Sequence, residues 1–271
     1  MAADPSAPPD GVLAAFGCDV APMRLAGGQG GTWRSGEVIL KPTDNPDEIA
    51  WLAGLPAQVE QAGFRIARCM PAASGAWVVG GWFAQAAIAG DHAKGRWREV
   101  LAACDAFHAA AAHLPRPAFL DARTDSWAVA DRVAWQEAPL APYPAVAPAL
   151  SRLSAALTPV DLPSQVIHGD FGGNVLFAAG LAPGVIDIAP YWRPAGFAAA
   201  VVVVDAIVWE GAGPDLLDAV AGIPQIGQLL LCAEFRRIME LDGQLRQRGR
   251  DRLHDIQAHL PLVDLLCARF G

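Results

Sequence analysis

Apolar residues recur with different periods in the two parts of the chain. In the first ninety residues they gather in short runs separated by glycine and proline, as at positions 37–41 and 76–84, and such runs are typical of β-strands. From residue 96 onward they recur every three or four positions, which is the period of an amphipathic helix. The pattern therefore predicts an α+β protein, with strands first and mostly helices afterwards.

The helical pattern is clearest over residues 96–114, where Trp97, Leu101, Cys104 and Phe107 share one face and Pro115 follows. Proline ends a helix because it disfavours the helical conformation of the residue before it. Further helices are expected over residues 145–157, 215–222, 225–240 and 251–270. The second part of the chain should thus be largely helical.

Two short apolar runs interrupt this helical part and predict a β-hairpin. They are residues 175–177 and 185–188, and the segment between them has the small residues, glycine and proline of a loop. Antiparallel pairing would bring Asn174, at the start of the first run, beside Asp187, near the end of the second. An amide oxygen and a carboxylate facing one point suit Mg²⁺, which keeps waters and takes further ligands from substrate phosphates.

Asp170 precedes a Phe-Gly-Gly turn that leads into Asn174. A carboxylate in this place would lie close enough to the metal to accept a proton from an attacking hydroxyl group. The segment is therefore a candidate phosphotransfer centre.

The sequence His168-Gly169-Asp170, with Asn174 and then Asp187, resembles the catalytic core of the aminoglycoside phosphotransferase and choline kinase family, in the protein-kinase-like superfamily. The resemblance implies a two-lobed fold, with a small antiparallel-sheet N-lobe and a larger, mostly helical C-lobe. It also implies that Asp170 is the catalytic base, that Asn174 and Asp187 bind magnesium, and that His168 supports the loop.

The loop departs from the kinase pattern in its length. That pattern places four residues between the aspartate and the asparagine, whereas three separate Asp170 from Asn174 here. Its two glycines allow a tighter backbone path. Residues 174–177 and 186–194 are also similar to an uncharacterised bacterial subgroup of the superfamily, a likeness that implies no substrate.

The first part of the chain contains residues typical of nucleotide binding in such proteins. Residues 25–33 are rich in glycine, and a strand ending in Lys41 follows, similar to the V-A-I-K strand of kinases. We expect Gly28, Gly30 and Gly31 to let backbone N–H groups approach the phosphates of a nucleotide. Lys41 is expected to supply a positive charge beside its α- and β-phosphates. Trp33 stands where the third glycine of G-x-G-x-x-G would be.

Glu48, in the first turn of a helix expected after Pro46, is the candidate to pair with Lys41, and Glu60 is the alternative. The strand at 76–84 is interrupted by two glycines, and we interpret this point as the passage between the lobes across the adenine pocket. The expected domains are therefore residues 1–83 for nucleotide binding and 84–271 for the helical lobe with the catalytic hairpin.

The bulk properties restrict the class of protein. A chain of 271 residues that is 53% hydrophobic can bury a substantial core. The net charge of -8 argues against general nucleic-acid binding and is compatible with a cationic acceptor. The first ten residues lack the basic and apolar regions of a signal peptide, and the apolar run at 198–208 is too short to span a bilayer, so we expect a soluble cytoplasmic protein without a membrane partner.

Several residues admit two interpretations at this stage. Tyr191, Trp192 and Arg193 could contact the acceptor or phosphates, or could pack beneath the loop. Asp205 could bind a cationic substrate or have an ordinary surface or capping role, and His108 is read as a surface or core histidine rather than a metal ligand.

The function expected from these features is an ATP- and Mg²⁺-dependent O-phosphotransferase that acts on a hydroxyl group of a small molecule. The alternative, motivated by the short loop and the missing third glycine, is an inactive kinase-like protein that binds nucleotide as a regulator or scaffold. The sequence contains no G-x-S-x-G, H-E-x-x-H or Walker A motif, so hydrolase, zinc-protease and P-loop chemistry are not favoured.

Overall fold

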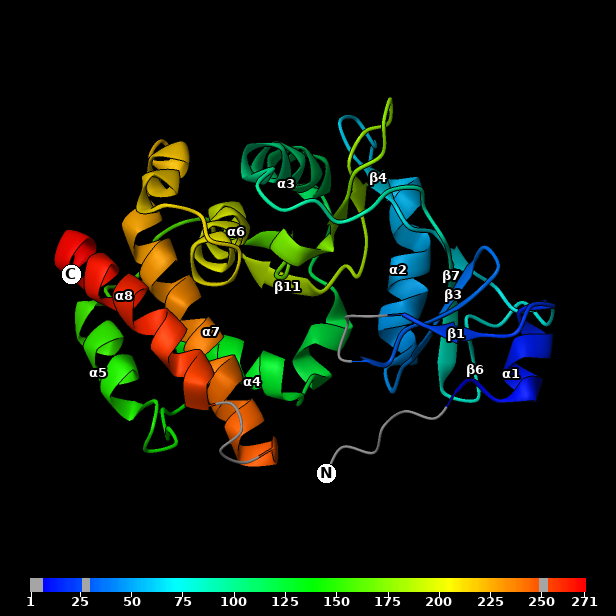
Figure 1. Ribbon diagram of the computed structural model, residues 1–271, viewed down its shortest axis with the longest axis horizontal. Coiled ribbons are helices and arrows are strands. Elements are labelled where there is room, and N and C mark those ends of the chain that lie inside the picture. The colour runs from blue at the N-terminus through cyan, green and yellow to red at the C-terminus, as the bar shows by residue number, and fades with distance from the viewer. Residues whose placement is uncertain (1–6, 26–29, 249–252) are drawn as a thin grey trace. The chain divides into compact units, whose positions relative to one another are not determined.

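The chain divides into two compact units, and each is described by itself. The computed structural model describes residues 7–25, 30–248 and 253–271. Within these, a sheet unit comprises residues 7–91 and 176–186, and a helical unit comprises residues 92–175 and 187–271 (Figure 1). The sheet unit thus extends past residue 83, the expected boundary, and includes part of the segment expected to form the catalytic hairpin.

The sheet unit contains the predicted antiparallel sheet. Its strands are β1 (Met23–Arg24), β2 (Trp33–Ser35), β3 (Val38–Pro42), β5 (Cys69–Met70), β6 (Val78–Val79) and β7 (Trp82–Ala86). The order is β1-β2-β3-β7-β5, with β6 also pairing β7. Leu40 lies opposite Ala84, both fully buried, and they pack with Val12 of the first helix, α1 (Asp10–Ala15), and with Phe16, which caps its C-terminus. An apolar core therefore holds the strand that carries Lys41.

The two glycines interpreted as the passage between lobes have a different role. Gly80 and Gly81 connect β6 to β7, in which Val79 lies opposite Trp82, so they form a two-residue hairpin turn. Their φ angles are 57° and 78°, and a turn with two positive φ angles matches the right-handed twist of the flanking strands. That interpretation was wrong, because a Gly-Gly pair fits a tight turn as well as a linker and the chain stays in this sheet until Ala86.

Helix α2 (Pro46–Gln58) follows β3 and begins where the sequence predicts a helix. The side chain of Asn45 accepts a hydrogen bond from the Glu48 backbone N–H at 3.2 Å, and Pro46 occupies the first helical position. Both features are typical of helix N-termini. The local sequence is therefore sufficient to explain where this helix starts.

A separate three-stranded sheet contains the two runs that predict the hairpin. Its order is β4-β10-β9, with β4 (Arg65–Ile66), β9 (Val175–Leu176) and β10 (Gly184–Val185). The two runs are neighbours, as expected, but both strands are shorter than predicted. The parallel pairing of β10 with β4 was not predicted, because the two strands lie far apart in the chain.

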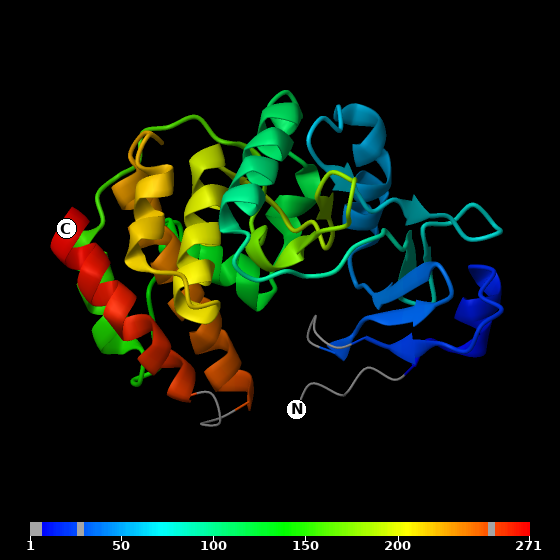
Figure 2. The same cartoon turned by 45° about the horizontal axis from the view of Figure 1, so that its top comes forward.

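The helical unit is built around α6 (Ala195–Trp209) and α7 (Ile226–Arg248). The remaining helices are α3 (Trp97–Ala111), α4 (Ser126–Ala134), α5 (Ala147–Ala156) and α8 (Leu253–Phe270), with 3₁₀ turns η2 (Ala118–Ala122), η3 (Gly172–Asn174) and η4 (Pro214–Val220). α3 packs beside α6, and α7 lies against α4, α6 and α8 (Figure 2). Residues 197–204 of α6 are all buried, as expected for a central helix that is apolar all round.

Most predicted helices of this unit are present. α3, α5 and α8 lie where the pattern indicates, α7 extends beyond the predicted residue 240, and residues 214–220 form a 3₁₀ turn. α4 and α6 were not predicted. The α6 sequence has no polar face, so its periodicity could not distinguish a buried helix from a buried strand.

Candidate functional site

The candidate catalytic loop leaves a two-stranded sheet in the helical unit. β8 (Gln165–His168) pairs antiparallel with β11 (Pro190–Arg193), so that His168 lies opposite Pro190 and Ile167 opposite Tyr191. The chain then turns at Gly169, where an added Cβ would overlap the Tyr191 ring. Glycine is therefore required here because an aromatic ring lies against the backbone.

His168 supports the loop from the protein interior, the role that the family resemblance implies. It is fully buried, and its Nδ1 accepts hydrogen bonds from the backbone N–H groups of Asp170 at 3.2 Å and Ala189 at 3.3 Å. It thus ties the catalytic loop to the segment that follows Asp187. That prediction is confirmed.

His108, on α3, supports His168 in turn. Its Nε2 accepts from the His168 backbone N–H at 3.0 Å, and its Nδ1 donates to the Cys104 carbonyl at 2.7 Å. Burial lowers the pKa of His108 to about 3, although the bond to Cys104 opposes that shift, so the ring is neutral near pH 7. The sequence identified a surface or core histidine but not its position under the loop, because only the tertiary packing of α3 against β8 reveals it.

The short loop brings Asp170 and Asn174 into contact. The Asn174 Nδ2 donates to the Asp170 carbonyl oxygen at 2.6 Å and to its carboxylate Oδ2 at 3.1 Å, across the 3₁₀ turn η3. These bonds use the amide nitrogen, and they leave the amide oxygen as the group that would bind a cation. The loop is one residue shorter than the kinase pattern, and the two side chains nevertheless contact each other.

Asp187 lies in a bend after β10 rather than within a strand, which corrects the expected strand end at residue 188. Its φ is 48°, a left-handed conformation that is uncommon for residues with a side chain and that recurs at functional sites. No group of three or more His, Cys, Asp or Glu that could hold a metal occurs in the described part of the chain. One carboxylate with one amide oxygen is instead the oxygen-only set that suits Mg²⁺, so the chemistry of Asp187 and Asn174 fits this ion.

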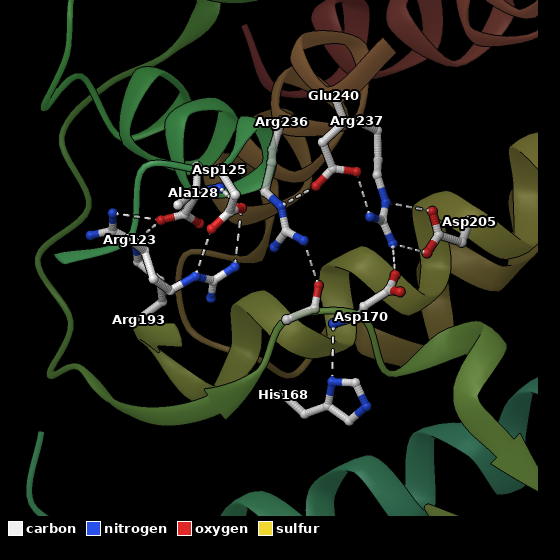
Figure 3. Close-up of polar contacts among 12 residues, drawn as sticks. Arg123, Asp125, Ala128, His168, Asp170, Arg193, Asp205, Arg236, Arg237 and Glu240 are labelled. Atoms are coloured by element: carbon white, nitrogen blue, oxygen red, sulfur yellow. Dashed lines mark hydrogen bonds and ion pairs between the residues drawn. The ribbon is translucent and has the colours of Figure 1, made fainter. Parts of the chain in front are cut away.

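Two consecutive arginines of α7 hold the loop from the other side (Figure 3). Arg236, 1% exposed, donates to the Gly169 carbonyl at 2.7 Å and to Glu240 at 2.8 Å. Arg237 forms an ion pair with the Asp170 Oδ1 at 2.6 Å and also contacts Asp205 and Glu240. Sequence reasoning missed both arginines, and the available signal was a pair of adjacent arginines flanked by the apolar residues Phe235 and Ile238 within a predicted helix.

This charge cluster sets the ionisation of the two aspartates. Burial raises the pKa of Asp170, but the Arg237 guanidinium outweighs that effect and holds the pKa well below its usual range. At Asp205 burial prevails over the same guanidinium and raises the pKa to about 6. Asp170 is therefore ionised at neutral pH, as a proton acceptor must be.

Tyr191, Trp192 and Arg193 belong to β11, and the contacts of Tyr191 and Arg193 favour packing beneath the loop over substrate contact. The Tyr191 ring is 6% exposed and has the Arg236 guanidinium carbon 4.7 Å from its centroid. Arg193 is paired with Asp131 at 2.7 Å and with Glu137. Such contacts are typical of cation–π stacking and of a partly buried ion-pair network.

A pocket of about 310 Å³ adjoins Asp170 within the helical unit. The carboxylates in its wall are Asp170, Asp205, Glu210, Glu240 and Asp255, and the wall also includes Arg237, Trp209 and His259. Trp209 is 46% exposed, although it is a large aromatic residue. The site thus combines an ionised carboxylate, an adjoining cavity and an excess of negative charge.

The predicted nucleotide-binding residues belong to the sheet unit. The glycine-rich segment lies in sequence between β1 and β2, which pair antiparallel. Gly28 lies outside the described residues. Gly30 has a φ of 76°, and its carbonyl accepts from the Arg24 Nε at 2.7 Å. Gly31 follows Gly30 directly, and the phosphate contacts expected of these glycines stay a prediction.

Lys41 lies on β3 opposite Phe83, and its Nζ is 3.4 Å from the Gln85 side-chain oxygen. Burial lowers the pKa of Lys41 to about 8, with a smaller opposing effect from Cys69. Glu48 lies at the start of α2, where its carboxylate accepts from the Asn45 Nδ2 at 3.2 Å, a capping contact. Its expected pairing with Lys41 stays a prediction, as does that of the alternative, Glu60.

Comparisons with known proteins identify the family and the fold of the chain. Residues 42–189 match the phosphotransferase enzyme family. A search of curated protein sequences found no significant match. The matched range contains every predicted catalytic and metal-binding residue together with Glu48, while Lys41 directly precedes it.

Solved structures of kinases share the whole fold. A spectinomycin phosphotransferase bound to ADP and spectinomycin is 14% identical, with 95% of each chain covered and a TM-score of 0.58. An aminoglycoside phosphotransferase from Alicyclobacillus acidocaldarius is 15% identical, with 99% of this chain and 96% of that chain covered and a TM-score of 0.60. Choline kinase from Streptococcus pneumoniae is 10% identical, with 92% and 94% covered and a TM-score of 0.62. The predicted kinase-like α+β fold is confirmed.

No helix in the described part of the chain has both the length and the apolar character needed to cross a membrane.

Proposed function

The chain belongs to the phosphotransferase enzyme family, and from that premise we propose that it transfers the γ-phosphoryl group of ATP to a hydroxyl group of a small, amine-bearing molecule. The observation that carries the proposal is the position of Asp170. Its side chain is 47% exposed and lines the pocket, while Arg237 and Asn174 each hold one of its carboxylate oxygens. A carboxylate that is both fixed and accessible suits a general base.

In the proposed reaction the acceptor hydroxyl lies in the pocket beside Asp170. As its oxygen forms a bond to the γ-phosphorus, the bond from that phosphorus to the bridging oxygen of ADP breaks, and the hydroxyl proton passes to the Asp170 carboxylate. The transition state of such a transfer is loose, so catalysis depends mainly on positioning and on charge neutralisation. Asp170 orients the hydroxyl, which contributes about 10²- to 10⁴-fold when proton transfer is included.

Asn174 and Asp187 would hold Mg²⁺, which when bound neutralises charge on the nucleotide phosphates. Asp170 has a separate task, because its Oδ1 is engaged by Arg237 at 2.6 Å. Lys41 would add a positive charge to the α- and β-phosphates, with Gly30 and Gly31 allowing backbone N–H groups to approach them. ATP and Mg²⁺ are thus the proposed co-substrate and cofactor.

The charge of the pocket supports an amine-bearing acceptor. Five carboxylates contribute to its wall, whereas among the described residues that line it Arg237 supplies the guanidinium charge. An ammonium group would reduce this excess, and the partly exposed Trp209 would add an aromatic ring for a cation–π contact. A volume of about 310 Å³ suits a small molecule.

The test measures phosphorylation of defined acceptors by the purified chain with Mg-ATP. Spectinomycin and choline are the cationic acceptors, myo-inositol is the neutral control, and ³¹P NMR detects the phosphomonoester. We expect turnover with a cationic acceptor, none with myo-inositol, and turnover lowered by about 10²- to 10⁴-fold in Asp170→Asn.

Stabilisation of the chain by Mg-ATP, without a phosphorylated product from any acceptor in a broad panel, would contradict the proposal and favour a nucleotide-binding module. Thermal unfolding with and without Mg-ATP supplies that comparison. Turnover that Asp170→Asn leaves unchanged would contradict the assigned base.

A further inference from the structure

Arg237 lies where three carboxylates converge (Figure 3). Its Nη2 is 2.6 Å from the Asp170 Oδ1, its Nη1 is 2.7 Å from the Glu240 Oε2, and its Nε is 2.8 Å from the Asp205 Oδ1. A second contact joins its Nη2 to Asp205. The planar, five-donor guanidinium is suited to such a multiple contact, and a lysine would supply only a point charge.

The side chains of this cluster differ in how far they are exposed to solvent. The side chains of Arg237, Asp205 and Glu240 are 11%, 13% and 8% exposed, whereas that of Asp170 is 47% exposed. The guanidinium is therefore fixed by two nearly buried carboxylates, and it reaches a third that faces the pocket. Fixed groups of this kind are what hold a reacting side chain in one geometry.

Its helical neighbour constrains the same loop through the backbone. Arg236 donates to the Gly169 carbonyl at 2.7 Å, and Glu240 bridges the two arginines by accepting from Arg236 at 2.8 Å and from Arg237 at 2.7 Å. The loop backbone and the Asp170 side chain are thus held by adjacent residues of one rigid helix.

We propose that Arg237 is the positioning residue for Asp170: it fixes the Oδ1 so that the carboxylate presents its remaining acceptor capacity to the hydroxyl group in the pocket. Asn174 contacts the other oxygen, Oδ2, at 3.1 Å, so the two contacts together restrict rotation of the carboxylate. The inference rests on the proposed function and deepens it. An arginine contact weakens a carboxylate as a base, but positioning outweighs basicity when the transition state is loose.

A purely structural role is the competing explanation, because the same guanidinium joins α6, through Asp205, to α7. The two roles differ in how the residue couples to Asp170. A residue that acts through Asp170 loses its catalytic effect once Asp170 is gone, whereas a structural residue costs the same in either background.

The experiment is a double-mutant cycle with Arg237→Met, Arg237→Lys and Asp170→Asn, measured with the cationic acceptor that gives the highest turnover. We expect Arg237→Met to lower kcat by about 10- to 100-fold, as a small misplacement of a reacting group does, with the KM for ATP changed by less than about twofold. Arg237→Lys should recover part of kcat, and Arg237→Met should cost less than about threefold in the Asp170→Asn background. Equal losses in both backgrounds, or a loss confined to KM, would overturn the proposal.

Arg193→Met is the matched control. Arg193 is 12% exposed and is likewise paired with two carboxylates, Asp131 and Glu137, but no contact with Asp170 is among its ion pairs in the described residues. Its effect on kcat should be the same in the presence and absence of Asp170. Coupling of Arg193 to Asp170 as strong as that of Arg237 would show that the cycle detects general destabilisation and would overturn the inference.

A crystal structure of Arg237→Lys supplies a readout independent of turnover and remains accessible if Arg237→Met does not fold. We expect the Asp170 carboxylate to occupy more than one rotamer in the variant and one in the wild type. A single, unchanged rotamer in the variant would overturn the positioning role. Absence of turnover in the wild-type protein would instead contradict the proposed function, so the two failures are distinguishable.

Discussion

The two units have opposite effects on the charged form of their candidate functional residue, Asp170 in the helical unit and Lys41 in the sheet unit. In the helical unit the Asp170 carboxylate meets Arg237, which lowers its pKa despite burial. In the sheet unit Lys41 lies on a strand whose neighbouring position, Leu40, is fully buried in an apolar core, and burial lowers the pKa of Lys41 to about 8. The protein therefore stabilises the charged form of the first group and destabilises that of the second.

This difference indicates how each unit contributes to function. A charge that is already compensated keeps its geometry before substrate binds, which is the preorganisation that catalysis requires. A desolvated lysine gains most when an anion such as a phosphate approaches, because the anion restores the stability of the ammonium form. We infer that the helical unit supplies a fixed base and that the sheet unit supplies a desolvated cation whose charged form a bound phosphate would stabilise.

The largest expected effect concerns Asp187, the proposed metal ligand. Asp187→Ala should lower turnover by about 10³-fold or more and also weaken binding of Mg-ATP, since a metal contributes several kcal/mol of charge stabilisation. Asp170→Asn should lower turnover by about 10²- to 10⁴-fold and leave Mg-ATP binding within about twofold. Steady-state kinetics and nucleotide titration measure both quantities. Full turnover in both variants would show that the roles are wrongly assigned.

The next effect is on folding and compares a buried cation in each unit. Arg236→Met should lower the free energy of unfolding by about 3–5 kcal/mol, because it removes a buried charge that donates to Glu240 and to the Gly169 carbonyl and leaves Glu240 with Arg237 alone. Lys41→Met should leave that free energy unchanged or raise it by up to about 1 kcal/mol, since it removes a charge that burial destabilises. Urea unfolding of the nucleotide-free proteins tests the contrast. Equal destabilisation by the two substitutions would remove the distinction between the units.

A smaller effect is expected in the pH dependence of nucleotide binding. Because the pKa of Lys41 is lowered to about 8, its ammonium form is lost as the pH rises through that value. Affinity for Mg-ATP should fall by about 10-fold between pH 7 and 9.5, the contribution of one hydrogen bond to a charged group. Lys41→Arg should bind with a flatter profile, since arginine stays charged. A wild-type profile as flat as that of the variant would contradict the role of Lys41.

The lowered pKa of Lys41 also predicts that the free energy of unfolding rises with pH. The lowered pKa of Lys41 means that the folded protein carries an unfavourable charge below about pH 8, and this penalty disappears as the pH rises toward the unfolded value of about 10.4. The wild type should therefore gain stability relative to Lys41→Met over that window. Urea unfolding at pH 7, 8.5 and 10 measures the difference in free energy of unfolding between the wild type and Lys41→Met. If the wild type instead lost stability relative to the variant as the pH rises, the prediction would be contradicted.

The smallest effect concerns the pocket wall. Trp209→Ala should raise the KM of a cationic acceptor by about two- to fivefold, the size of an exposed cation–π contact, and leave kcat and the KM for ATP nearly unchanged. Trp209→Phe, which keeps an aromatic face, should recover part of the affinity. An equal rise in KM for choline and for a neutral alcohol would indicate lost packing instead of cation recognition.

The sequence alone identified the residues whose chemistry is local. His168, Asp170, Asn174 and Asp187 fall within twenty residues of one another, so a short loop and two neighbouring strands are enough to predict them as a group. The N-terminus of α2, the apolar strand of Lys41 and the amphipathic α3 were predictable for the same reason, because caps and periodicity act over a few residues.

Only the tertiary structure determined what surrounds these residues. Arg236 and Arg237 meet the loop across 67 positions of sequence, and His108 lies 60 positions before the backbone group that it binds. Gly80 and Gly81 fit a turn as well as a linker until β7 is seen to pair with β3. Local sequence thus determined which side chains form the candidate site, whereas their support, charge state and pocket depended on long-range packing, because burial and ion pairing arise only when distant segments meet.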